Sequence, residues 1–519
     1  MSHPAVICSR HVPPMRALLL PLAAAALLAG CATVSPADRP TDARERAPRN
    51  IIVMIADGSG YSSIRATRFW SGAPLAVDSP DFLHAPMAVS QLSTRNQPVA
   101  GPEGLAQTPD MEWDRTRGCS ATPLEGEVPA LYGMGIAYPR GFVGYEWNRI
   151  TAPDSANTMS ALMTGVRSYN NAINVDGNGR PQTSLARIAH ETGRAVGIVT
   201  TSAIADATPA AAGGAHSVSR ALRNEITAQL FGRGEVTLIA GAGNPDWTDD
   251  ATRRDKPDHR WFSPETWAQV KAGAPVGGPQ GPRWTLVEDA DAVRAMAAGT
   301  VAVPARLAAI VKAFEGVQQY RGGIGPSTDE PFATPLLADQ PSLADMTRSA
   351  LRRLDGAGAG FFLMVEESNT DRASHANNLG RVIEARLAFE DAVRAVVSHV
   401  SDTSTAASWN NTLLIVTADH DHLLFGPDGA TIAFQPVADS GKGRLPAHRW
   451  LGNGHSNLPV PLFVRGAGAG VVLSATLGGE QLDGRAAPPA TPCEWQGPVL
   501  DQAMVGRALL QLSRDGARK

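Results

Sequence analysis

The sequence predicts a three-layer α/β/α protein with a large, mostly parallel central sheet and loop insertions. Apolar runs of strand length, such as Phe361–Val365, alternate along the chain with segments that carry apolar residues at helical spacing, such as Leu379–Val400. Uninterrupted apolar runs are typical of strands that a parallel sheet buries on both faces. Several of these runs end abruptly in acidic residues, and an open α/β sheet binds its ligands just beyond the carboxyl ends of its strands.

The bulk composition is that of an ordinary globular protein. The 519 residues are 43% hydrophobic and 18% charged, with a formal net charge of −4. A charge so close to neutral gives no support for a nucleic-acid partner. Of the four cysteines, only Cys119 and Cys493 lie outside the N-terminal leader, and the sequence leaves open whether they pair.

Residues 1–31 resemble the signal peptide of a bacterial lipoprotein. The apolar run Ala17–Ala29 follows one basic residue and is too short to span a bilayer, and its position favours Met15 as the true start. The run closes in Leu-Ala-Gly-Cys31, which resembles a lipobox, so we expect a lipid anchor on Cys31. The expected location is therefore the periplasm or the outer membrane of a bacterium. A plain cleaved signal that ends in these residues by chance is the alternative.

Composition also divides the rest of the chain. Residues 32–48 are polar and carry prolines, which is typical of a flexible tether, and residues 49–515 are expected to form the folded domain. Two stretches within it, at about 74–146 and 245–281, are rich in proline and weakly periodic. We expect both to be insertions. The first is expected to form strands and loops that cover the functional site, with bounds that the sequence does not show, and the second to be a loop excursion.

The regular elements follow from the apolar pattern. Strands are expected over Asn50–Ala56, Ala195–Thr201, Glu235–Ala240, Trp284–Val287, Phe361–Val365, Thr412–Thr417 and Leu462–Arg465. Helices are expected over Tyr61–Trp70, Ala156–Met163, Ser342–Arg353 and Leu379–Val400. Because Pro153 disfavours helix before it, the second of these helices begins close to Ser155.

The strongest local signal follows the strand Phe361–Val365. Glu366 and Glu367 come directly after the apolar run, and Asp371 and His375 follow, four residues apart. One turn of helix places Asp371 and His375 on the same face, close enough to share an ion. Taken alone, the segment is explained equally well by a solvated loop after a core strand.

Other segments place polar residues in the same way. They are Asp57 after the first strand, Asp206 and Thr208 after the second, Arg220 before a helix, and Asp419, His420 and His422 after Thr412–Thr417. Ser155 is expected at a helix N-terminus, where free N–H groups favour an anion. His455, which lies between a glycine and a serine, is expected in a turn. Taken singly, each is explained as readily by a turn, a helix cap or a surface charge.

Metal ions explain the set as a whole. Several carboxylates gathered at one edge of a sheet repel one another and protonate in part unless cations compensate them. Mixed Asp and His ligands suit zinc, whereas Asp, Glu and Thr oxygens suit magnesium. The sequence therefore predicts a polynuclear site with two kinds of metal. Ser155 becomes a useful nucleophile there when a metal holds its alkoxide.

These motifs, in this order, resemble the alkaline phosphatase family. The matching segments are Ile-Ala-Asp57-Gly, Asp154-Ser155-Ala, Asp206-Ala-Thr208-Pro, His216 through Arg220, Val-Glu366 with Asp371 and His375, Thr-Ala-Asp419-His420, and Gly-His455. Their spacing makes the resemblance highly specific, and it spans roughly Asn50 to Arg465. The resemblance implies an alkaline-phosphatase-like fold, residues 49–515 as the catalytic domain, and small-molecule phosphate monoesters as substrates.

The resemblance also implies a role for each matching residue. The implied ligands of a first zinc ion are Asp371, His375 and His455. Those of a second zinc ion are Asp57, Asp419 and His420. Those of one magnesium ion are Asp57, Thr208 and Glu366, with Asp206 beside them. Ser155 is implied to attack phosphorus and form a phosphoserine, while Arg220 binds two phosphate oxygens.

The chain departs from the family pattern in a few places. Asn157 and Met159 replace small residues behind the nucleophile. Arg372 stands where the family varies, and we expect it to tune phosphate release. His422 extends the usual Asp-His pair, and we expect it to support the ligands rather than to be one of them. The family is often dimeric, which leaves a homodimer open.

Two other functions remain open at this point. A phosphodiesterase or another hydrolase of the wider superfamily is the nearer one. Against it, Asp154–Thr158 lacks the Cys- or Ser-x-Pro-x-Arg signature of sulfatases, and diesterases commonly lack the Glu and Thr magnesium ligands. The other is a noncatalytic lipoprotein that binds phosphate. The loss of a ligand would favour it, and every ligand is present in the sequence.

Overall fold

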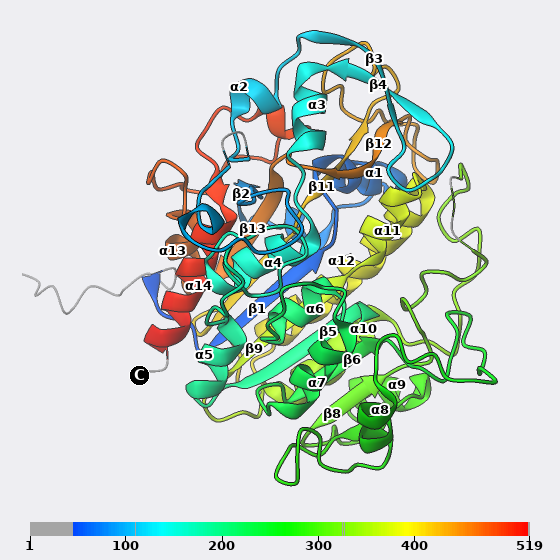
Figure 1. The fold of residues 1–519 in the computed structure, drawn as a ribbon, viewed down its shortest axis with the longest axis vertical. Helices are drawn as coiled ribbons and strands as arrows, with labels where there is room; N and C mark the ends of the chain where they lie inside the picture. Colours follow the sequence, from blue (N-terminus) through cyan, green and yellow to red (C-terminus); the bar gives the residue numbers. More distant parts are fainter. Residues whose placement is uncertain (1–44, 109–110, 324, 326, 517–519) are drawn as a thin grey trace, which may run out of the picture. The chain divides into compact units, whose positions relative to one another are not determined.

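A ten-stranded sheet forms the centre of the computed structural model, which describes residues 45–108, 111–323, 325 and 327–516 (Figure 1). All strand pairs are parallel except the two made by β13. In order across the sheet, the strands are β14 (Leu500–Asp501), β2 (Leu83–Ala88), β13 (Val460–Gly466), β10 (Thr412–Thr417), β1 (Asn50–Ala56), β9 (Phe361–Glu367), β5 (Ala195–Ala203), β6 (Leu238–Ala242), β8 (Leu307–Ile310) and β7 (Thr285–Val287).

Helices cover both faces of the sheet, because its strands are apolar on both sides. In β1, Ile51 and Val53 pack into one hydrophobic core, and Ile52 and Met54 pack into the other. The first core also receives α4 (Ser155–Thr164), α5 (Leu185–Glu191), α6 (Ala207–Ala212), α7 (Arg223–Gly232), α8 (Pro264–Lys271), α13 (Ala469–Leu473) and α14 (Gln502–Gly516). The second receives α1 (Tyr61–Ser71), α9 (Ala290–Ala298), α10 (Leu343–Leu354) and α12 (Leu379–Ser401). The predicted three-layer architecture is confirmed.

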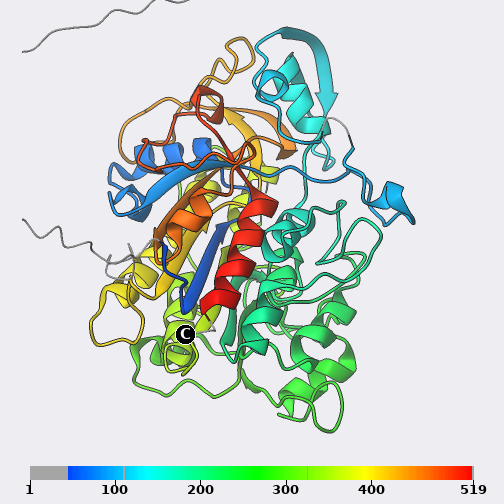
Figure 2. The same ribbon diagram turned by 90° about the vertical axis from the view of Figure 1, so that its left-hand side faces the viewer.

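The smaller elements lie mostly beyond one end of the sheet, where the hairpin of β3 and β4 projects (Figures 1 and 2). They are α2 (Arg115–Gly118), β3 (Pro123–Pro129), β4 (Ala137–Phe142), α3 (Val143–Ile150), α11 (Asn369–His375), β11 (Asp421–Phe425), β12 (Arg449–Ser456) and the short 3₁₀ turns η3 (Ala76–Asp78), η4 (Pro102–Gly104) and η5 (Pro492–Glu494). A disulfide joins Cys119 to Cys493 across 374 residues, which answers the question that the sequence left open.

The structure defines the strands expected in the first proline-rich stretch and corrects the loop expected in the second. The stretch 74–146 includes β2, which pairs with β13 and β14 and so belongs to the central sheet. Pro86 obscures this strand, because a proline inside an apolar run argues against a sheet interior. The stretch 245–281 includes the helix α8.

The leader and the first part of the tether, residues 1–44, lie outside the described residues. From residue 45 onward, the described residues belong to one compact unit. Within that unit, no helix combines the length and the apolar character that crossing a membrane requires.

Candidate active site

Four neighbouring strands bring the predicted site residues together. β10, β1, β9 and β5 are parallel and adjacent, so their carboxyl ends meet at one edge of the sheet. Asp57 directly follows β1, and Glu366 is the second-to-last residue of β9. Asp419 and Asp206 follow β10 and β5 within three residues. All four carboxylates therefore face a shared region, as the sequence predicts.

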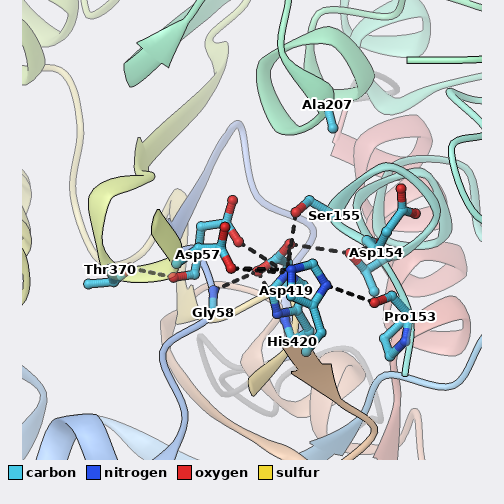
Figure 3. A network of polar contacts seen from close by, with 12 residues as sticks. Asp57, Gly58, Pro153, Asp154, Ser155, Ala207, Thr370, Asp419 and His420 are labelled. Carbon is cyan, nitrogen blue, oxygen red and sulfur yellow. Dashed lines mark hydrogen bonds and ion pairs between the residues drawn. The ribbon is translucent and has the colours of Figure 1, made fainter. Parts of the chain in front are cut away.

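An inner cluster surrounds His420 (Figure 3). Its Nε2 atom lies 3.2 Å from Ser155 Oγ, 3.3 Å from Asp57 Oδ1 and 3.5 Å from Asp419 Oδ2. Asp419 and His420 are completely buried. Asp419 Oδ1 accepts hydrogen bonds from the backbone N–H groups of Gly58 and His420, which fix its orientation.

The start of α4 positions Ser155. Asp154 caps this helix, and its carboxylate accepts a hydrogen bond from the Asn157 N–H at 3.1 Å. The Asn157 side chain in turn donates to Gln91 Oε1 and Asn170 Oδ1, both at 2.8 Å. The residue that departs from the family pattern is thus an anchor that ties the first turn of α4 to two neighbouring segments.

A second cluster surrounds Asp371. Its Oδ1 atom lies 2.7 Å from His422 Nε2 and 3.3 Å from His455 Nε2, and its Oδ2 atom lies 3.3 Å from His375 Nε2. Asp371 and His375 share one turn of α11, as their spacing predicts. The expectation that His455 lies in a turn is wrong. His455 lies in β12, paired with His422 of β11, because its glycine neighbours adopt an extended conformation there.

Backbone carbonyls fix the tautomers of two of these histidines. His375 Nδ1 lies 2.6 Å from the Asn453 carbonyl oxygen, and His455 Nδ1 lies 2.9 Å from that of Pro153. A carbonyl only accepts, so each Nδ1 carries the proton and donates it. The two Nε2 atoms, 3.0 Å apart, then face each other with lone pairs when both rings are neutral. Such an arrangement calls for a cation at these nitrogens.

The carboxylates of the site are mutually destabilising. Burial raises the pKa of Asp57 well above its usual range, and the charges of Asp419 and Asp371 raise it further. Burial likewise raises the pKa of Glu366 to about 8. Burial also opposes ionisation of Asp371, but His375 and His455 outweigh that effect and lower its pKa well below the usual range. A bound cation would relieve the charge that raises the first two values.

The residues present fit metal ions. Among the described residues, two groups can offer ligand atoms that lie within 4.8 Å of one another: Asp57, Asp419 and His420, and Asp371, His420, His422 and His455. Asp57 Oδ1 and Thr208 Oγ1 are buried and form no hydrogen bond. Unpaired buried oxygens are costly unless a ligand satisfies them. Carboxylate, hydroxyl and imidazole donors are also the types that bind zinc and magnesium.

Two arginines share one carboxylate beside the cluster. Arg220 donates to Asp206 Oδ1 at 2.8 Å and to Asp154 Oδ2 at 3.4 Å, and Arg372 donates to Asp206 Oδ2 at 2.8 Å. Although burial opposes ionisation of Asp206, the two guanidinium groups lower its pKa well below the usual range. Asp206 therefore stays ionised and holds both arginines in place.

The cluster opens into a cavity of about 470 Å³. Ser155, Arg220 and Asp371 line it, together with residues that the sequence did not single out: Tyr132, Arg223, Trp261 and Tyr320. Tyr132 lies at the tip of the β3–β4 hairpin, with its ring 4.5 Å from that of His375. Tyr132 and Trp261 come from the two proline-rich stretches, where no periodic pattern indicates which side chains point inward.

Known proteins resemble this chain over much of its length. A family model described as alkaline phosphatase matches residues 143–237 and 326–442. The chain is 30% identical over 350 residues to streptomycin-6-phosphate phosphatase of Streptomyces griseus, which covers 60% of this chain and 73% of that protein. It is 29% identical over 417 residues to alkaline phosphatase 4 of Bacillus subtilis, which covers 78% of this chain and 70% of that protein.

A solved structure shows the same fold. The alkaline phosphatase of the Antarctic bacterium TAB5 superposes with a TM-score of 0.55 at 19% identity, over 91% of this chain and 99% of that one. The fold and the site together define a hydrolase of the alkaline phosphatase superfamily. Within that superfamily, the chain belongs to the alkaline phosphatase family, whose members depend on metal ions.

Proposed function

We propose that the protein hydrolyses phosphate monoesters through a phosphoserine on Ser155. The observation that carries the proposal is the position of Ser155 Oγ. It lies at the start of α4, 3.2 Å from His420 Nε2, in the cavity that Arg220 also lines. A helix N-terminus favours a phosphate group, and Arg220 adds a planar pair of donors for two of its oxygens.

The proposed metal set is two zinc ions and one magnesium ion. Asp371, His375 and His455 would hold one zinc ion, and Asp57, Asp419 and His420 the other. Asp57, Thr208 and Glu366 would hold magnesium. When bound, these ions would favour the ionised form of Ser155 and offset the negative charge of the phosphate. His422 and Asp206 would orient Asp371 and the two arginines, respectively.

The reaction has two displacements. Ser155 Oγ forms a bond to phosphorus while the bond from phosphorus to the ester oxygen breaks, and the alcohol leaves with a proton. Water then attacks the phosphoserine, which releases inorganic phosphate and restores Ser155. In both steps Arg220 binds two non-bridging oxygens, and Arg372, held 2.8 Å from Asp206, adds positive charge that tunes phosphate release.

The test compares a monoester with a diester of the same alcohol. We expect kcat/KM for p-nitrophenyl phosphate to exceed that for bis(p-nitrophenyl) phosphate by about 10²-fold or more, because a diester carries one negative charge fewer for the cationic site to bind. A preference for the diester would favour the phosphodiesterase alternative. Turnover of neither ester would favour a noncatalytic phosphate-binding protein.

We also propose that the protein is exported and anchored by lipid on Cys31. Residues 1–31 support this by sequence alone, and the disulfide between Cys119 and Cys493 is consistent with an oxidising compartment. In detergent phase partitioning of the full chain, the wild type should enter the detergent phase and Cys31→Ala should remain in the aqueous phase. Equal partitioning of the two would contradict the anchor. We further propose that the protein forms a homodimer. The molar mass of the same preparation, measured by light scattering, tests this proposal.

A further inference from the structure

The cavity contains side chains that the proposed reaction does not use. Ser155 and several of the proposed metal ligands line the cavity, and Arg223 and Trp261 line it as well. Arg223 is the first residue of α7, and Trp261 belongs to the stretch 245–281. Because Ser155, Arg220 and the metal ions are proposed to bind the phosphate, the remaining side chains of the cavity are available to the leaving group of a bound ester.

Trp261 holds the guanidinium group of Arg223. The group lies 4.7 Å from the centre of the Trp261 ring, which is 2% exposed and so forms a fixed platform. Thr227, one turn after Arg223 on the same face of α7, donates a hydrogen bond to the Trp261 carbonyl oxygen at 2.5 Å. The Trp261 platform is therefore anchored to α7, and its contact with Arg223 positions the positive charge before a ligand arrives.

Arg223 differs from the other two arginines of the cavity in having no acidic partner. Arg220 and Arg372 both form ion pairs with Asp206. Throughout the described residues, no carboxylate lies within ion-pair distance of Arg223, and its guanidinium donates no hydrogen bond. Nor does Arg223 stabilise α7, because a positive charge in the first turn of a helix opposes the helix dipole. The free donors of Arg223 are thus available to a ligand.

We infer that Arg223 forms a second anion subsite, so that the preferred substrates are phosphate monoesters whose leaving group carries a second anionic group. The inference rests on the proposed function, since it assigns the leaving group of that same reaction. A guanidinium group stacked on an aromatic ring presents its edge donors in one plane, which matches a carboxylate or a second phosphate. Inorganic phosphate alone, bound at Ser155 and Arg220, would leave this subsite unused.

The experiment measures the ratio of the kcat/KM values for a charged and an uncharged leaving group. For the holoenzyme we compare kcat/KM for phenyl phosphate with that for 3- and 4-carboxyphenyl phosphate, which add one negative charge to the leaving group. We expect the wild type to prefer the better carboxylated ester by about fivefold, the scale of a partly exposed ion pair. Arg223→Gln should bring the ratio close to one, and Arg223→Lys should restore part of it. The preference should also weaken as ionic strength rises.

A control variant distinguishes the loss of the Arg223 subsite from a general effect of removing one positive charge. Arg253→Gln removes a positive charge from an exposed position in the same stretch, 245–281, that does not line the cavity, and should keep the wild-type ratio. If Arg223→Gln lowered kcat/KM for phenyl phosphate and for the carboxylated esters by the same factor, the role of Arg223 would be structural and the inference would be overturned. A wild type that shows no preference for the carboxylated esters would also overturn it. If no monoester is hydrolysed at all, the proposed function itself fails.

Discussion

Replacing Ser155 with alanine is expected to lower kcat/KM for p-nitrophenyl phosphate by about 10³-fold or more, which corresponds to ~4 kcal/mol of transition-state stabilisation. The physical reason is that Ser155 Oγ is the only protein atom proposed to bond to phosphorus. Its nearest site partner, His420 Nε2, lies 3.2 Å away and is held by Asp57 and Asp419, so the rest of the site should survive the change. Initial-rate kinetics at fixed metal concentrations give the measurement.

A second readout follows the covalent step. Rapid acid quenching of the wild type during turnover should leave phosphate on the peptide that contains Ser155, detected by mass spectrometry. Ser155→Ala should show no label while it keeps the wild-type metal content. Label on a different residue, or turnover by Ser155→Ala at the wild-type rate, would rule out Ser155 as the nucleophile.

Replacing His420 with asparagine is expected to remove metal as well as activity. His420 Nε2 faces both Asp57 and Asp419, so its loss removes the nitrogen ligand of the proposed second zinc site. We expect the variant to bind about one metal equivalent fewer per chain than the wild type and to lose about 10³-fold or more in kcat/KM. Elemental analysis after dialysis, beside the kinetic assay, checks both effects.

The matched control is His190→Asn. His190 is exposed on α5, outside the cavity, so this variant should keep both metal and activity. Treatment of the wild type with a chelator should reproduce the loss seen for His420→Asn, and added zinc and magnesium should reverse it. Full turnover by the metal-free wild type would contradict a metal-dependent reaction.

The regular core could be predicted because its sequence patterns are strong. β1 and β10 have the predicted bounds, since an unbroken apolar run leaves little choice in a parallel sheet. β2 was not predicted, because Pro86 interrupts its pattern and its partners β13 and β14 lie far along the chain. Its place in the sheet is set by tertiary pairing rather than by local sequence.

The inner part of the site could also be predicted, and its outer part could not. Asp57, Glu366 and Asp419 each follow a recognisable strand, and the common direction of those strands brings them together. The strand conformation of His455 was missed because glycine neighbours indicate a turn until the pairing with His422 is known. Tyr132 and Arg223 reach the cavity only through the path of the surrounding segments, which no local spacing encodes.

The bond between Cys119 and Cys493 makes most of the chain a closed ring. Ser155, Asp371, His420 and His455 all lie between the two cysteines in sequence. If a protease cuts one exposed loop inside this ring, the two pieces remain covalently joined by the disulfide until a reductant is added. Cleavage of the β3–β4 hairpin, for example, would open the mouth of the cavity without releasing any fragment.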